Sequence, residues 1–86
     1  MRCKQKFTIV LTKEDAQFDG WQTNLSEVIN LVDVVWSGSC TPEEARKRYD
    51  ALVMEQTHKY RQLKTLAKWL PVRLYDAEGN QLAQES

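Results

Sequence analysis

The sequence has 86 residues, of which 42% are hydrophobic and 28% are charged, so it is long enough for one small globular domain and too short for two. Twelve basic and twelve acidic side chains give a formal net charge of zero at pH 7, which favours neither a nucleic acid nor a membrane as the default partner. The charge is unevenly placed, because residues 46–73 carry eight basic side chains and only two acidic ones. We therefore predict a single domain, residues 1–86, with a local basic region.

The first predicted element is a strand over residues 6–12. Phe7, Ile9 and Leu11 alternate with β-branched residues, which is typical of a strand with one face in a core. This apolar run is too short for the core of a signal peptide, and no stretch of the sequence is long enough to span a membrane. We therefore expect a cytoplasmic protein without membrane contact.

Residues 25–36 follow the spacing of an amphipathic helix. Asn24 and Glu27 match a capping box. The apolar residues behind them recur at helical intervals, at Leu25, Val28, Ile29, Val32, Val35 and Trp36. The rival interpretation is a strand, since Val, Ile and Trp favour pleated sheet, but the segment shows no clean alternation. We predict a helix here and a loop over residues 37–40.

Residues 41–70 form the longest predicted element, one uninterrupted helix. Thr41 is an N-cap, Pro42 suits the first helical position, and Glu44 completes a capping box. The helix ends before Pro71. At 1.5 Å per residue it is about 40 Å long, more than a compact domain of this size needs, so part of it is expected to project or to meet a partner. Its apolar stripe consists of Ala45, Tyr49, Leu52, Val53, Tyr60, Leu63, Leu66, Ala67 and Leu70.

A short hairpin is predicted after Pro71. Residues 72–76 alternate again, and the segment from Asp76 to Asn80 has turn chemistry, with Gly79 at the left-handed position. The element order is then β-α-α(long)-β-β. We predict an α+β two-layer domain in which a small antiparallel sheet is covered on one face by an antiparallel helix pair.

Residues with catalytic or metal-binding chemistry are sparse. Cys3 and Cys40 fit no metal-binding spacing and are predicted to be free thiols. His58 is the only histidine, and it has no serine or cysteine near it in sequence, so a solvated side chain is favoured over a general base. Glu55 and His58 match half of a di-iron Glu-x-x-His site, but the chain offers no second half. We predict no catalytic residue, no metal site, no cofactor and no enzymatic activity.

The outer side of the long helix carries the best functional signal. Arginine and lysine there are suited to acidic groups or phosphates, and tryptophan is suited to an anchoring role. A solvated face is the competing interpretation, because the helix macrodipole favours basic residues near a C-terminus and because the tryptophan may instead close the core. The candidate partner-binding residues are Met54, His58, Arg61, Lys64, Thr65, Lys68 and Trp69.

These features predict a non-enzymatic small protein-interaction module, of the regulator, inhibitor or adaptor type, that binds a partner protein through this face. The acidic residues between positions 14 and 33 are consistent with self-association against the basic face, but a solvated surface is the favoured interpretation. The alternative function is a nucleic-acid-binding module using the same face. Phosphate binding weakens steeply with salt and an anchored protein interface does not, so the two are separable, and the zero net charge favours the protein partner.

Overall fold

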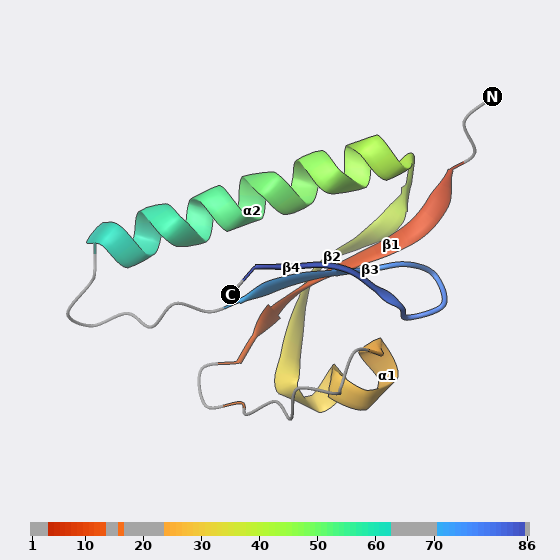
Figure 1. Cartoon of the computed structure of the whole chain (residues 1–86), viewed down its shortest axis with the longest axis horizontal. Coiled ribbons are helices and arrows are strands. Elements are labelled where there is room, and N and C mark those ends of the chain that lie inside the picture. Colours follow the sequence, from red (N-terminus) through yellow and green to blue (C-terminus); the bar gives the residue numbers. More distant parts are fainter. Residues whose placement is uncertain (1–3, 14–15, 17–23, 63–70, 86) are drawn as a thin grey trace.

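The computed structural model describes residues 4–13, 16, 24–62 and 71–85 (Figure 1). Four of its strands form one antiparallel sheet in the order β2-β1-β3-β4, which confirms an α+β fold and adds one strand to the three predicted. The elements in chain order are β1 (Gln5–Thr12), α1 (Leu25–Val28), a 3-10 turn η1 (Ile29–Leu31), β2 (Val32–Cys40), α2 (Pro42–Gln62), β3 (Val72–Tyr75) and β4 (Gln81–Glu85).

The strand β1 lies in the middle of the sheet and is buried on both faces. Phe7 and Ile9 point to the side of α2, where they pack in one cluster with Tyr49 of the helix and Leu74 of β3. Apolar residues spaced three or four positions apart lie on one face of a helix. In α2 this apolar face packs on the sheet, which is why the helix docks here. The predicted strand over residues 6–12 is therefore confirmed, but the expectation of a single buried face is wrong, because Thr8 and Val10 on the other face are buried as well.

A second apolar cluster covers the other face of the sheet. It joins Val10 of β1 and Tyr75 of β3 to Val28 of α1 and Val32 of β2. Adjacent residues of a strand point to opposite faces, so Ile9 and Val10 belong to different clusters. Figure 1 shows the same arrangement, with the strands between α2 above and α1 below. The predicted helix pair on one face is thus wrong, because the two helices lie on opposite sides of the sheet.

The predicted helix over residues 25–36 is only partly correct. The helix α1 ends at Val28, η1 ends at Leu31, and the chain then enters β2, which also includes the predicted loop at 37–40. Between Ile9 and Val10 the register with β2 shifts, and Val35 is the additional residue. This β-bulge places Val34 opposite Val10 on one face and Trp36 opposite Ile9 on the other. The bulge also explains why the segment lacks strict alternation and resembles a helical stripe.

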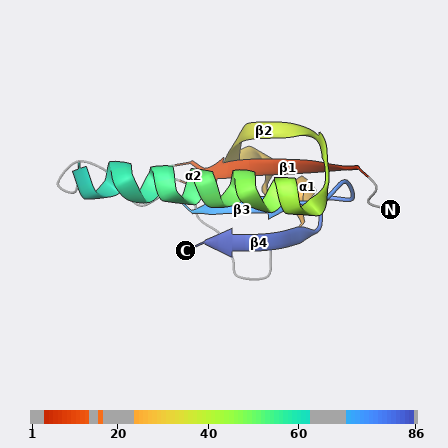
Figure 2. The ribbon, with the colours of Figure 1, turned by 90° about the horizontal axis from the view of Figure 1, so that it is seen from above.

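The helix α2 connects β2 to β3 by crossing over β1. Seen from above, it runs along β1 and β3, with β2 and β4 on either side (Figure 2). Its described part ends at Gln62, and the predicted continuation through residues 63–70 lies outside the described residues. The hairpin after Pro71 is as predicted: Gly79 has a φ of +83°, and Asp76 Oδ1 accepts hydrogen bonds from the backbone N–H of Glu78 and of Asn80.

Val10 and Val34 form a matched pair for testing that both faces of the sheet are covered. They are cross-strand partners on the same face, but Val10 is 0% exposed and Val34 is 51% exposed. We expect Val10→Ala to lower the free energy of unfolding by about 2 kcal/mol, because it removes buried methyl groups and leaves a cavity. Val34→Ala should change it by less than about 0.5 kcal/mol. Urea denaturation of both variants measures the difference, and equal effects would contradict a second buried face.

Candidate interaction surfaces

The start of α2 is fixed by a reciprocal capping box directly after β2. The backbone N–H of Glu44 donates to Thr41 Oγ1 at 3.3 Å, and the Thr41 hydroxyl and backbone N–H donate to Glu44 Oε1 at 3.0 and 3.3 Å. These hydrogen bonds hold the pKa of the Glu44 carboxyl below its ordinary value, with smaller contributions from Lys4 and Arg48. The predicted cap is confirmed, and it sets the direction in which the helix leaves the sheet.

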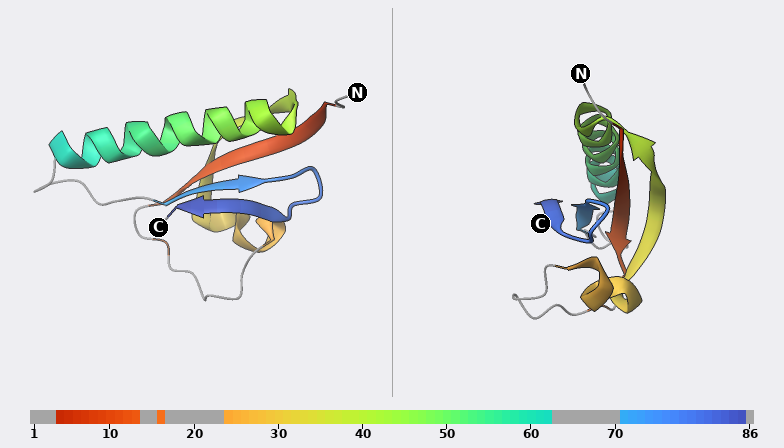
Figure 3. Two further views of the ribbon diagram at one scale, coloured as in Figure 1. Left: turned by 45° about the horizontal axis from the view of Figure 1, so that its top comes forward. Right: turned by 90° about the vertical axis from the view of Figure 1, so that its right-hand side faces the viewer.

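Burial of α2 decreases along its length. Ala45 and Tyr49 on its core side are buried, whereas Leu52 and Val53, about one turn after Tyr49, are only partly buried. In the left view of Figure 3, the end of the described helix extends past the ends of the strands. The first half of the helix is therefore anchored to the sheet, and the second half offers much of its surface to solvent or to a partner.

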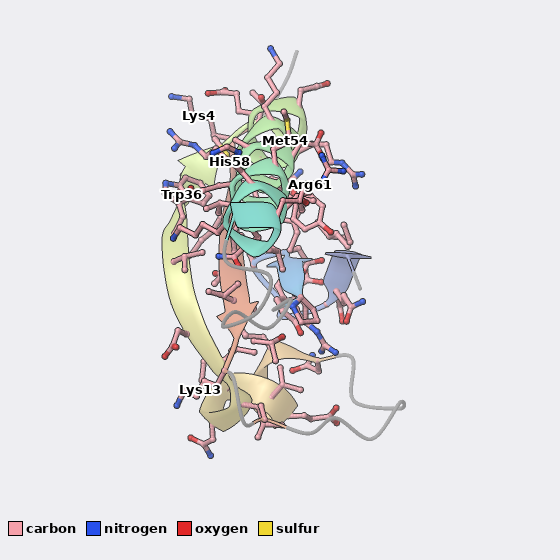
Figure 4. The ribbon with its side chains drawn as sticks, turned by 90° about the vertical axis from the view of Figure 1, so that its left-hand side faces the viewer. Lys4, Lys13, Trp36, Met54, His58 and Arg61 are labelled. Carbon is pink, nitrogen blue, oxygen red and sulfur yellow. The ribbon has the colours of Figure 1, made fainter. Side chains whose placement is uncertain are left out.

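Three of the predicted site residues lie together on this second half. Met54, His58 and Arg61 are exposed, and Met54 at 72% is the most exposed of the large apolar residues in the described part of the chain. With Val53 and Thr57 they line a shallow hollow of about 270 Å³. Figure 4 looks along α2 from the end of its second half and shows the side chains of Met54, His58 and Arg61 around the helix. The other four predicted residues, Lys64, Thr65, Lys68 and Trp69, lie outside the described residues.

Two of the cations of α2 are partly neutralised by ion pairs within the helix. Arg46 Nε lies 3.3 Å from an Asp50 carboxylate oxygen, and Lys59 Nζ lies 3.6 Å from one of Glu55. Glu55 is thus engaged with Lys59 rather than held in a site with His58. Among the described residues, no three His, Cys, Asp or Glu side chains form a group that could hold a metal ion.

A second surface, which the sequence analysis missed, lies between α2 and the edge strand β2. The Arg48 guanidinium carbon stands 4.6 Å from the centre of the Trp36 ring, a cation–π contact between helix and strand. Val35, Ala51 and Leu52 complete a groove of about 260 Å³ around them. Trp36 was predicted in a helical core stripe; it packs against the core, but from a strand and with one side partly exposed. The sequence did contain a signal for this groove, namely the rival interpretation of this segment as a strand. A strand that includes Trp36 can present it beside the helix that follows.

A third hollow, about 510 Å³, lies on the face of α1, between that helix, β1 and the turn from β3 to β4. Several of its polar groups serve the local structure. Asn24 Oδ1 caps α1 by accepting from the backbone N–H of Ser26 at 3.0 Å, and Asp76 Oδ1 accepts from two backbone amides of its own turn. This hollow is best explained as the space beside a capped turn rather than as a built ligand site.

Cys40 is a free, buried cysteine at the end of β2. Burial is the main cause that raises the pKa of its thiol, and the nearby Glu44 carboxylate adds to the effect. A neutral, buried thiol is a poor nucleophile, so Cys40 serves as an apolar core residue here. The free-thiol prediction is confirmed for Cys40, and Cys3 lies outside the described residues.

Comparison of the chain with protein-family models, with curated proteins and with solved structures found no match in any of the three. Within the described residues, no helix is both long enough and apolar enough to span a membrane. A function for the chain is therefore inferred from the surfaces of its own fold.

The capping box predicts a specific response to acid. The pKa of Glu44 is lowered in the folded state, so its stabilising effect is complete above the ordinary carboxyl pKa and is lost as the pH falls through the lowered value. Glu44→Gln keeps a hydrogen-bonding group that does not titrate, so it should lose less stability than the parent when acidified from about pH 5 to about pH 3. Thr41→Ala should cost about 1 kcal/mol at neutral pH. Urea denaturation midpoints of the parent and both variants, measured across this pH range, test the two expectations. If the parent and Glu44→Gln lose the same stability on acidification, the expected effect of Glu44 is contradicted.

Proposed function

We propose that this chain is a non-enzymatic protein-interaction module, of the regulator, inhibitor or adaptor type, that binds a partner protein through the outer face of α2. The described part of this outer face consists of Met54, His58 and Arg61. The observation that carries the proposal is the 72% exposure of Met54 beside Arg61, on the half of the helix where contact with the sheet decreases. Methionine and arginine are enriched in the cores of protein interfaces.

The chemistry of the hollow suits a protein partner. Methionine is flexible and polarisable, so it adapts to an apolar side chain of the partner without a preformed deep pocket. Arg61 beside it can make a bidentate ion pair with a carboxylate, which adds direction to the apolar contact. An apolar anchor next to one oriented charge is the usual composition of an interface hot spot.

Nucleic-acid binding through the same face is the weaker alternative. The described part of α2 contains five basic and four acidic side chains, so its net positive charge is small. Two of its cations, Arg46 and Lys59, already face carboxylates within the helix. Phosphate binding relies on cations that are free to replace counterions, and this helix offers few in its described part.

The outer face is tested by combining Met54→Ala with Arg61→Ala. Both side chains are exposed, so the double variant should unfold within about 0.5 kcal/mol of the parent. Its affinity for the partner recovered by pull-down from the native host should fall at least about tenfold, equivalent to roughly 1.4 kcal/mol. Lys59→Ala, on the same helix but outside the hollow, is the matched control and should bind as the parent does.

Two results would count against this proposal. A folded double variant with unchanged affinity would remove the outer face as the binding site. Recovery of the partner only without nuclease treatment, together with an affinity that falls steeply between low and physiological salt, would replace the protein partner by nucleic acid.

A further inference from the structure

The edge of β2 and the groove beside it form a second surface, on a different side of α2 from Met54 and Arg61. Within the described residues, β2 pairs with β1 on one side only, so its other side is an edge of the sheet. Figure 2 shows β2 to one side of α2, and Figure 4 shows Trp36 between the two elements. Alternate backbone N–H and C=O groups of an edge strand are available to another strand.

Residues 36–40 of this edge lie beyond the bulge at Val35 and pair with β1 in regular register. From Val34 to Cys40 the edge contains no charged residue and no proline. Val34 and Val35 are 51% and 43% exposed, and the side chains of residues 37–39 are small. Gly38 leaves room for the Trp36 ring, because a Cβ there would lie 3.0 Å from the ring carbon Cζ2. An extended chain can therefore approach this part of β2 closely.

The groove beside the edge has an apolar floor and one available positive charge. Trp36 and Leu52 form the floor, and Arg48 lies over the Trp36 ring. Glu44 accepts hydrogen bonds from Thr41 and interacts with Arg48 through its charge only, and Glu55 pairs with Lys59. Stacking on an aromatic ring orients a guanidinium while its N–H groups remain able to bind a carboxylate.

We propose that an extended peptide of a partner protein adds to the edge of β2, with an apolar side chain in the groove and a carboxylate on Arg48. Main-chain hydrogen bonds along residues 36–40 supply affinity, and the groove selects alternate side chains of the peptide. A second copy of the chain fits less well, because two-fold pairing centred on Trp36 would bring the two Arg48 side chains toward each other.

The first test uses a synthetic peptide of about eight residues, Val-Thr-Glu-Thr repeated, in which valine and glutamate take every second position and so share one face of an added strand. It is titrated into the full chain and followed by NMR. Amide signals of residues 35–40 and of Ala51 and Leu52 should shift, and the exchange of β2 amides with solvent should slow. A peptide in which proline replaces two consecutive central residues should bind at least about tenfold more weakly, because one of any two consecutive residues supplies an N–H group that pairs with the edge.

A charge exchange tests the role of Arg48. Arg48→Glu should weaken binding of the valine–glutamate peptide at least about tenfold and should favour the corresponding valine–lysine peptide. Arg61→Glu, the same reversal on the outer face of α2, should bind both peptides as the parent does. This control separates the groove from the proposed function, since either surface can fail while the other stands.

Three outcomes would overturn the inference. They are the absence of any shift with the parent chain at millimolar peptide, shifts confined to the outer face of α2, and equal loss of binding in Arg48→Glu and Arg61→Glu. Protection of the β2 amides that depends on protein concentration without peptide would assign this edge to a second copy instead.

Discussion

The burial of β1 on both faces is the constraint on which the rest of the fold depends. One strand carries two apolar surfaces: Phe7 and Ile9 face α2, while Val10 faces α1. A chain of this length has too little apolar surface for a large core, so it uses both sides of its central strand. The two helices are therefore separated by the sheet, and neither can pack against the other.

The bulge at Val35 is what allows β2 to serve both clusters. In a regular strand every second side chain points to the same face, so Val32, Val34 and Trp36 would all point to one side. With the additional residue, Val32 packs with Val28 and Tyr75, and Trp36 packs on the side of α2. A local irregularity of the backbone thus connects the two cores, and it also turns Trp36 toward Arg48.

The parts of the fold that the sequence predicted are those specified locally. The first strand follows from its own alternation, α2 begins where Thr41 and Glu44 cap it, and Gly79 takes the positive φ that its turn needs. Residues 32–36 were predicted as a helix, because a bulged strand and a helical stripe give similar apolar spacing. The pairing partner decides between them, and that partner is β1, distant in sequence. Of the predicted site, Met54, His58 and Arg61 lie together because they are three and four residues apart on one helix, whereas Trp36 and Arg48 meet only through tertiary packing.

The two surfaces arise from the single crossover of α2. Because β2 and β3 are both antiparallel to β1, they run in the same direction, and the helix that joins them must pass over β1. Neighbouring strands are about 4.8 Å apart and a helix is about 10 Å wide with its side chains, so one helix cannot cover all four strands. The sheet is left open beside β2, where the groove with Trp36 lies. The described end of α2 extends past the ends of the strands (Figure 3), and Met54 and Arg61 are exposed on the second half of this helix. The groove and the outer face are thus lined by different residues of α2, so we expect a substitution in one surface to leave the other in place.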